Sequence, residues 1–97
     1  AAAAEAAARV RAGEAQVSAA REKLGRAHRA LEDARKSGGK EKAQAAQADV
    51  RAARRELHQQ RAELARARQT AEDLHGTRSG EADRQQGERL RAEQALR

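Results

Sequence analysis

Residues 37–40, Ser-Gly-Gly-Lys, hold the only adjacent glycines in the chain and separate two long stretches of helix-forming residues. Glycine readily adopts the left-handed backbone conformation that ends many helices, so a helix that stops at Gly38 can reverse its direction there. Proline, the strongest helix breaker, is absent. These features predict an all-α fold, an antiparallel coiled-coil helical hairpin that turns at Gly38 and Gly39.

Large aliphatic residues recur every seven positions on both sides of the turn, as in coiled coils. In heptad terms these are a positions, and Ala71 continues their series. The d positions between them hold mainly alanine, with Gln60 and Leu74 as the large exceptions. Together they form a predicted seam between two helices, whose large aliphatic residues are Val10, Val17, Leu24, Leu31, Val50, Leu57, Leu64 and Leu74.

The two series mirror each other about the turn. If the chain folds so that facing residue numbers sum to 77, Leu64 meets Gly13 and every a position faces a d position. Large residues then face small ones, which lets the two backbones approach closely. Gln60, opposite Val17, is a candidate for fixing the register, as single polar seam residues do in other coiled coils.

Charges beside the seam support this register in part. Lys23 falls opposite Glu56, and Glu14 falls opposite Arg61, which are attractive pairs. Exposed pairs of this kind contribute about 0–1 kcal/mol each, so charge does not decide the fold.

A parallel assembly of two copies is an alternative arrangement. In the second arm each seam-flanking acid is followed five positions later by an arginine, which is the pairing pattern of parallel two-stranded coiled coils. The acids are Asp49, Glu56 and Glu63, and the arginines are Arg54, Arg61 and Arg68. The second arm could therefore pair with a copy of itself.

A second break is predicted between His75 and Glu81. Gly76 can end the second helix, and Ser79 can cap the start of another. The predicted segments are a first helix at 1–36, the Gly-Gly turn at 37–40, a second helix at 41–75, a loop at 76–80, and a short third helix or the start of a longer helix at 81–97.

Composition favours a structural module over an enzyme. The chain is 38% hydrophobic, but it has no aromatic residue and no cysteine. A two-helix rod offers no concave pocket, so we expect no catalytic site and no cofactor. The Glu72-x-x-His75 spacing occurs in di-iron bundles, but such sites need the motif twice, so we expect no metal site. We expect a protein partner or self-association instead.

The net charge of +6 allows an acidic partner, including nucleic acid. The second arm is locally basic, and the alternative reading is a basic helical bundle that binds phosphates through Arg51, Arg54, Arg55, Arg61, Arg66 and Arg68. Interspersed acids and the lack of aromatic residues for base stacking weigh against it. No apolar run is long enough to insert into a membrane, and we expect a cytoplasmic location.

Two Arg-, Glu-, Gln- and Ala-rich heptad arms around a short turn, residues 10–74, resemble the central-stalk proteins of bacterial type III secretion, the FliJ/YscO/HrpO group. The resemblance implies an antiparallel coiled coil that engages a hexameric ATPase, and it transfers no functional residue to this chain. We therefore expect a structural coiled-coil module for protein–protein assembly, as a stalk or scaffold of a secretion or ATPase machine.

Overall fold

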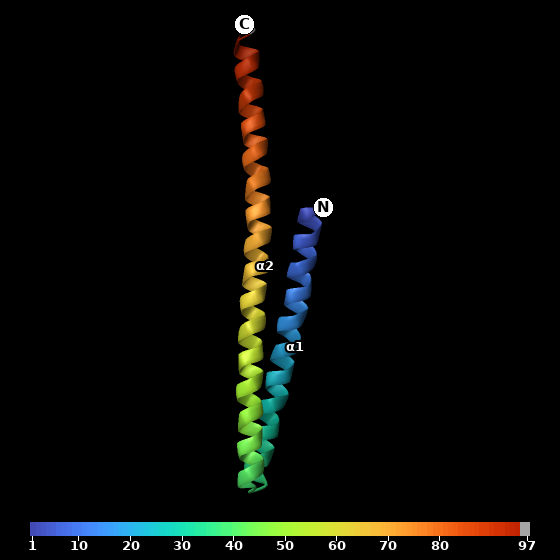
Figure 1. Cartoon of the computed structure of the whole chain (residues 1–97), viewed down its shortest axis with the longest axis vertical. Helices are drawn as coiled ribbons and strands as arrows, with labels where there is room; N and C mark the ends of the chain where they lie inside the picture. Colours follow the sequence, from blue (N-terminus) through green and yellow to red (C-terminus); the bar gives the residue numbers. More distant parts are fainter. Residues whose placement is uncertain (96–97) are drawn as a thin grey trace.

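Two long helices pack side by side and antiparallel, as Figure 1 shows. The computed structural model describes the backbone of residues 1–95, and their side chains apart from 77–85 and 93. Helix α1 spans Ala2–Lys36 and helix α2 spans Lys40–Ala95. The molecule is a rod with dimensions of 88 × 17 × 14 Å. The prediction of an all-α helical hairpin is confirmed.

Glycine makes the reversal between the helices possible. Gly38 has a φ of +76°, the left-handed conformation that side chains disfavour. Its N–H donates to the carbonyl of Arg35 at 3.3 Å, so a carbonyl in the last turn of α1 keeps a partner. The carbonyl of Gly39 then accepts the N–H of Ala43 at 2.9 Å, which begins α2. Lys40, expected in the turn, is the first residue of α2.

The helices meet along the a and d positions. In the described chain the buried hydrophobic residues are Ala6, Val17, Ala20, Leu31, Ala46, Val50, Ala53, Leu57 and Leu64. Val10, Leu24 and Leu74 are half-buried, and so is Gln60. The role of Gln60 in setting the register stays a prediction.

The observed packing follows the register in which facing residue numbers sum to 77. Leu57 and Ala20 belong to one core cluster, and Leu31 and Ala46 belong to a second cluster nearer the turn. Leu64 lies so close to Gly13 that a Cβ built on that glycine would be 3.0 Å from the Leu64 Cδ1. In each of these three places a large residue packs against a small one.

The alanine-rich start of α1 also packs against α2. Ala6 is 5% exposed, although the first nine residues contain no large aliphatic side chain. It shares a shallow groove with Ala67 and Thr70 of α2. Alanine-on-alanine contact thus extends the pairing of the helices close to the first residue.

The predicted break over 76–80 is wrong. Residues 81–95 are helical, as expected, but they continue α2 without interruption instead of forming a separate helix. Gly76 lies inside α2, and unlike Gly38 it has no positive φ. An isolated glycine costs a helix about 1 kcal/mol relative to alanine, and helix propagation on both sides outweighs that cost.

Replacing Leu57 with aspartate should unfold the hairpin. Leu57 is 7% exposed, so Leu57→Asp removes its apolar burial and places an unpaired carboxylate in the seam. We expect a loss of more than about 3 kcal/mol and a collapse of the helical circular dichroism signal. The exposed Arg51 provides the control, because Arg51→Ala should change stability by less than about 0.5 kcal/mol. Equal effects of the two changes would contradict the seam.

The two glycines inside α1 should respond differently to alanine. A Cβ at Gly25 would meet no atom within 4 Å, so Gly25→Ala should stabilise the chain by up to about 1 kcal/mol through helix propensity. Gly13→Ala should gain less, because its Cβ meets Leu64 at 3.0 Å. Urea unfolding of both variants measures the difference. Equal gains would show that Gly13 does not make room for Leu64.

Candidate protein-interaction surface

The residues that flank the seam form two broad faces of the rod. One face carries the residues that follow each d position, which are Glu14, Arg21, His28, Arg35, Gln47, Arg54, Arg61 and Arg68. We call it the arginine face. The opposite face carries the residues that precede each a position, which are Arg9, Gln16, Lys23, Ala30, Asp49, Glu56, Glu63 and Thr70. We call it the mixed face.

The two faces differ in charge. The arginine face holds five arginines and one carboxylate, whereas the mixed face holds two basic and three acidic residues. All residues of the arginine face are solvent-exposed. One side of the rod is therefore strongly positive, and the other is close to neutral.

A shallow groove runs between the helices on the arginine face. Its lining consists of Glu14, Val17, Ser18, Arg21, Arg61, Leu64, Ala65 and Arg68. The carboxylate Oε1 of Glu14 lies 3.9 Å from Nη2 of Arg68. Glu14 thus pairs with Arg68 and not, as predicted from the sequence, with Arg61. Arg68 lies one heptad further from the turn than Arg61. Arg21 and Arg61 line the same groove, so it holds three arginines and a single carboxylate.

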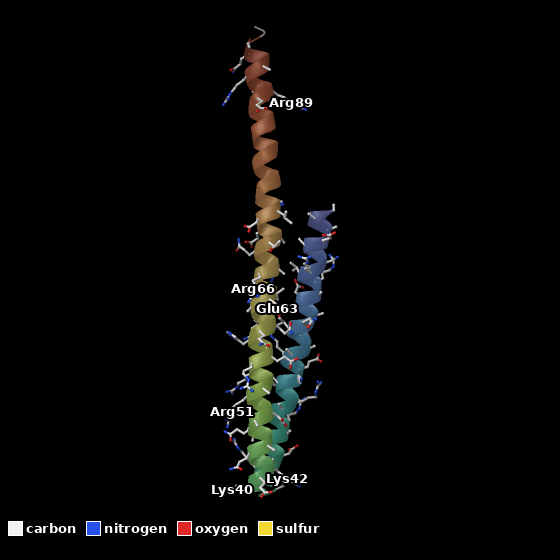
Figure 2. The ribbon with its side chains drawn as sticks, in the orientation of Figure 1. Lys40, Lys42, Arg51, Glu63, Arg66 and Arg89 are labelled. Atoms are coloured by element: carbon white, nitrogen blue, oxygen red, sulfur yellow. The ribbon has the colours of Figure 1, made fainter. Side chains whose placement is uncertain are left out.

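The mixed face carries the shorter ion pair between the helices. Nζ of Lys23 lies 2.9 Å from Oε2 of Glu56, which confirms their predicted position opposite each other. The two side chains are 59% and 43% exposed, so solvent weakens the pair to about 1 kcal/mol or less. On the same side Glu63, Arg66 and Arg9 line a groove near the start of α1, and Figure 2 labels the first two.

Within residues 1–95, no helix lies beside the last part of α2. Because α1 begins at Ala2, which the register places level with residue 75, residues 76–95 of α2 extend past it (Figure 1). This segment is about 30 Å long at 1.5 Å per residue. Leu90 lies in this segment and is 56% exposed. Arg89 lies next to it, far from α1 (Figure 2). We call this segment the α2 extension.

The described part of the chain contains neither a group of side chains that could bind a metal ion nor a helix that could span a membrane. No group of three or more His, Cys, Asp or Glu side chains is placed there to hold a metal ion. Glu72 and His75 are both exposed on α2. Neither helix, over the described residues, has an apolar stretch that could span a bilayer.

Comparison of the chain with known protein families, curated proteins and solved structures gives no match. The architecture is consistent with coiled-coil proteins as a class, through its long paired helices and its large-on-small seam. That class is defined by its shape, which by itself identifies no function.

Sequence reasoning missed the charge difference between the faces. The signal is in the sequence, because sorting the flanking residues of both helices by heptad position places five arginines and one acid on one side and three acids on the other. The charge difference is hidden when the second helix is considered alone, because that helix carries both a row of arginines and a row of acids. The α2 extension carried no comparable signal, because glycines at 76 and 80 suggested a break.

Reversing the charge of Arg21 should stabilise the hairpin. Arg21→Glu places a carboxylate in a groove that Arg61 and Arg68 also line, which replaces repulsion by attraction. We expect a gain of about 0.5–1 kcal/mol in urea unfolding at low salt, shrinking at 1 M salt. Arg55→Glu, the same change on the outer edge of α2, is the control and should have little effect. A salt-independent gain, or one shared by the control, would contradict crowding of arginines in the groove.

Proposed function

We propose that the chain is a structural module that mediates protein–protein assembly. The observation that carries this proposal is the α2 extension, a straight helix segment that projects past α1 and exposes Leu90. A single exposed helix buries its surface by packing against another element, and long rods position such contacts at a distance. The paired part of the hairpin then acts as the rigid arm that holds the extension in place.

A stalk or scaffold of a secretion or ATPase machine is the finer form of this proposal. The support for it is the combination of an antiparallel hairpin with charged outer faces, the pattern on which the resemblance to type III secretion stalk proteins rests. We propose no catalytic role and no cofactor, because the grooves between two helices are too shallow to exclude water from a reaction.

Nucleic-acid binding is the alternative function, and the positive charge of the arginine face is the observation behind it. Five arginines on one side can neutralise phosphates, and such binding weakens steeply as salt rises. Duplex DNA and single-stranded RNA should then bind at 50 mM salt and dissociate by 200 mM. Absence of binding at the lower salt removes this alternative.

Photo-crosslinking from the extension tests the assembly proposal. A photoreactive residue at Leu90, introduced in the cells that produce the protein, should form an adduct of one defined mass with another protein. The same residue at Ala48, exposed on the outer edge of the paired part, should form none. Reversing the exposed neighbours Arg89 and Arg91 to glutamate should weaken the Leu90 adduct. Adducts with nucleic acid, or equal adducts at both positions, would contradict the proposal.

A further inference from the structure

We propose that the groove of the arginine face is a docking site for a third helix, supplied by an acidic protein partner whose carboxylates repeat every seven residues. This inference rests on the proposed assembly function and names the chemistry of a partner at a second surface, separate from the α2 extension. Binding would convert the two-helix rod into a three-helix coiled coil over its paired part.

Charge selects the arginine face and an acidic occupant. Five arginines and one carboxylate leave this face strongly positive, and the Glu14–Arg68 pair at 3.9 Å neutralises little of it. The guanidinium groups of Arg21 and Arg61 line the same groove. Carboxylates placed between these groups would gain charge-assisted hydrogen bonds, for which the planar guanidinium is well suited.

The spacing of the arginines selects a helix. Arg54, Arg61 and Arg68 form a row in which neighbours are seven residues apart, about 10.5 Å along the helix axis. A second helix with one acidic residue per heptad keeps the same spacing over its whole length. The phosphates of a nucleic-acid duplex instead wind around their axis, so they would meet part of a straight row and then leave it. The row therefore fits an acidic helix better than a duplex.

The shape of the groove allows a helix to approach. Ser18 and Ala65, both small, line it on opposite helices, and Gly25 continues the low surface one heptad further along α1. Val17 and Leu64 lie beneath, but each is 6% exposed and offers little apolar area. The attraction is thus mainly electrostatic, and the affinity should fall as salt rises.

A second copy of this chain is a poorer occupant. Its own acidic row, Asp49, Glu56 and Glu63, has the required seven-residue spacing. That row lies on the mixed face, where Lys23 already pairs with Glu56 at 2.9 Å. Arg9 adds a further positive charge to the same face. Two chains of net charge +6 also repel each other.

A designed peptide probes the site in the full chain. The probe is a four-heptad helical peptide with one glutamate per heptad at equivalent positions, titrated by calorimetry at 50 mM salt. A peptide of identical composition in scrambled order is the peptide control. The double variant Arg54→Glu with Arg61→Glu should bind the probe at least about tenfold more weakly, which corresponds to about 1.4 kcal/mol.

A matched variant separates the groove from net charge. Arg55→Glu with Arg66→Glu lowers the net charge by the same amount away from the arginine face, and it should retain probe binding within threefold of the unmodified chain. A probe carrying lysine in place of glutamate should bind the Arg54/Arg61 variant and not the unmodified chain. Circular dichroism checks that both variants remain helical.

Several results would overturn the inference. Equal binding of the ordered and scrambled peptides would show unspecific charge attraction, and tighter binding of duplex DNA than of the probe would assign the face to nucleic acid. Self-association of the chain alone, abolished by the Arg54/Arg61 variant, would assign it to a second copy. If the Leu90 adduct forms but the probe does not bind, this inference is wrong and the proposed function stands. If no Leu90 adduct forms, the proposed function is wrong, whether or not the probe binds.

Discussion

Close packing of large residues on small ones across one seam is the constraint on which the structure depends. Leu64 lies directly against Gly13, and Leu57 shares a cluster with Ala20. The chain has no aromatic residue and few large aliphatics, so close approach of the backbones has to supply much of the contact. The register is therefore narrowly defined, since a shift of one residue would bring charged positions into the seam.

Once the seam is fixed, the position of every other side chain follows. The flanking positions become two faces, one with five arginines and one of mixed charge. The difference in helix length leaves the α2 extension unpaired. The candidate interaction surfaces thus follow from helix periodicity and length, because a two-helix rod has no interior in which to build a pocket.

The sequence predicts the hairpin well because its signals are local and periodic. Adjacent glycines at 38 and 39 mark the turn, and the seven-residue series gives the register. The predicted break at 76–80 is wrong because each of its two glycines costs a helix only about 1 kcal/mol, and helix propagation on both sides outweighs that cost. The predicted pairing of Glu14 with Arg61 is wrong for a different reason. Arg61 and Arg68 line the same groove, and a heptad pattern does not distinguish between them as partners of Glu14.

A distance measurement within one chain tests the hairpin most directly. Ser18 and Ala65 line one groove from opposite helices, and the chain has no native cysteine, so Ser18→Cys with Ala65→Cys gives two unique labelling sites. Spin labels there, diluted with excess unlabelled chain, should lie within about 20 Å, since packed helix axes are about 8–10 Å apart. A distance near 70 Å, expected for about 1.5 Å per residue in a continuous helix, would contradict the hairpin and favour a parallel assembly.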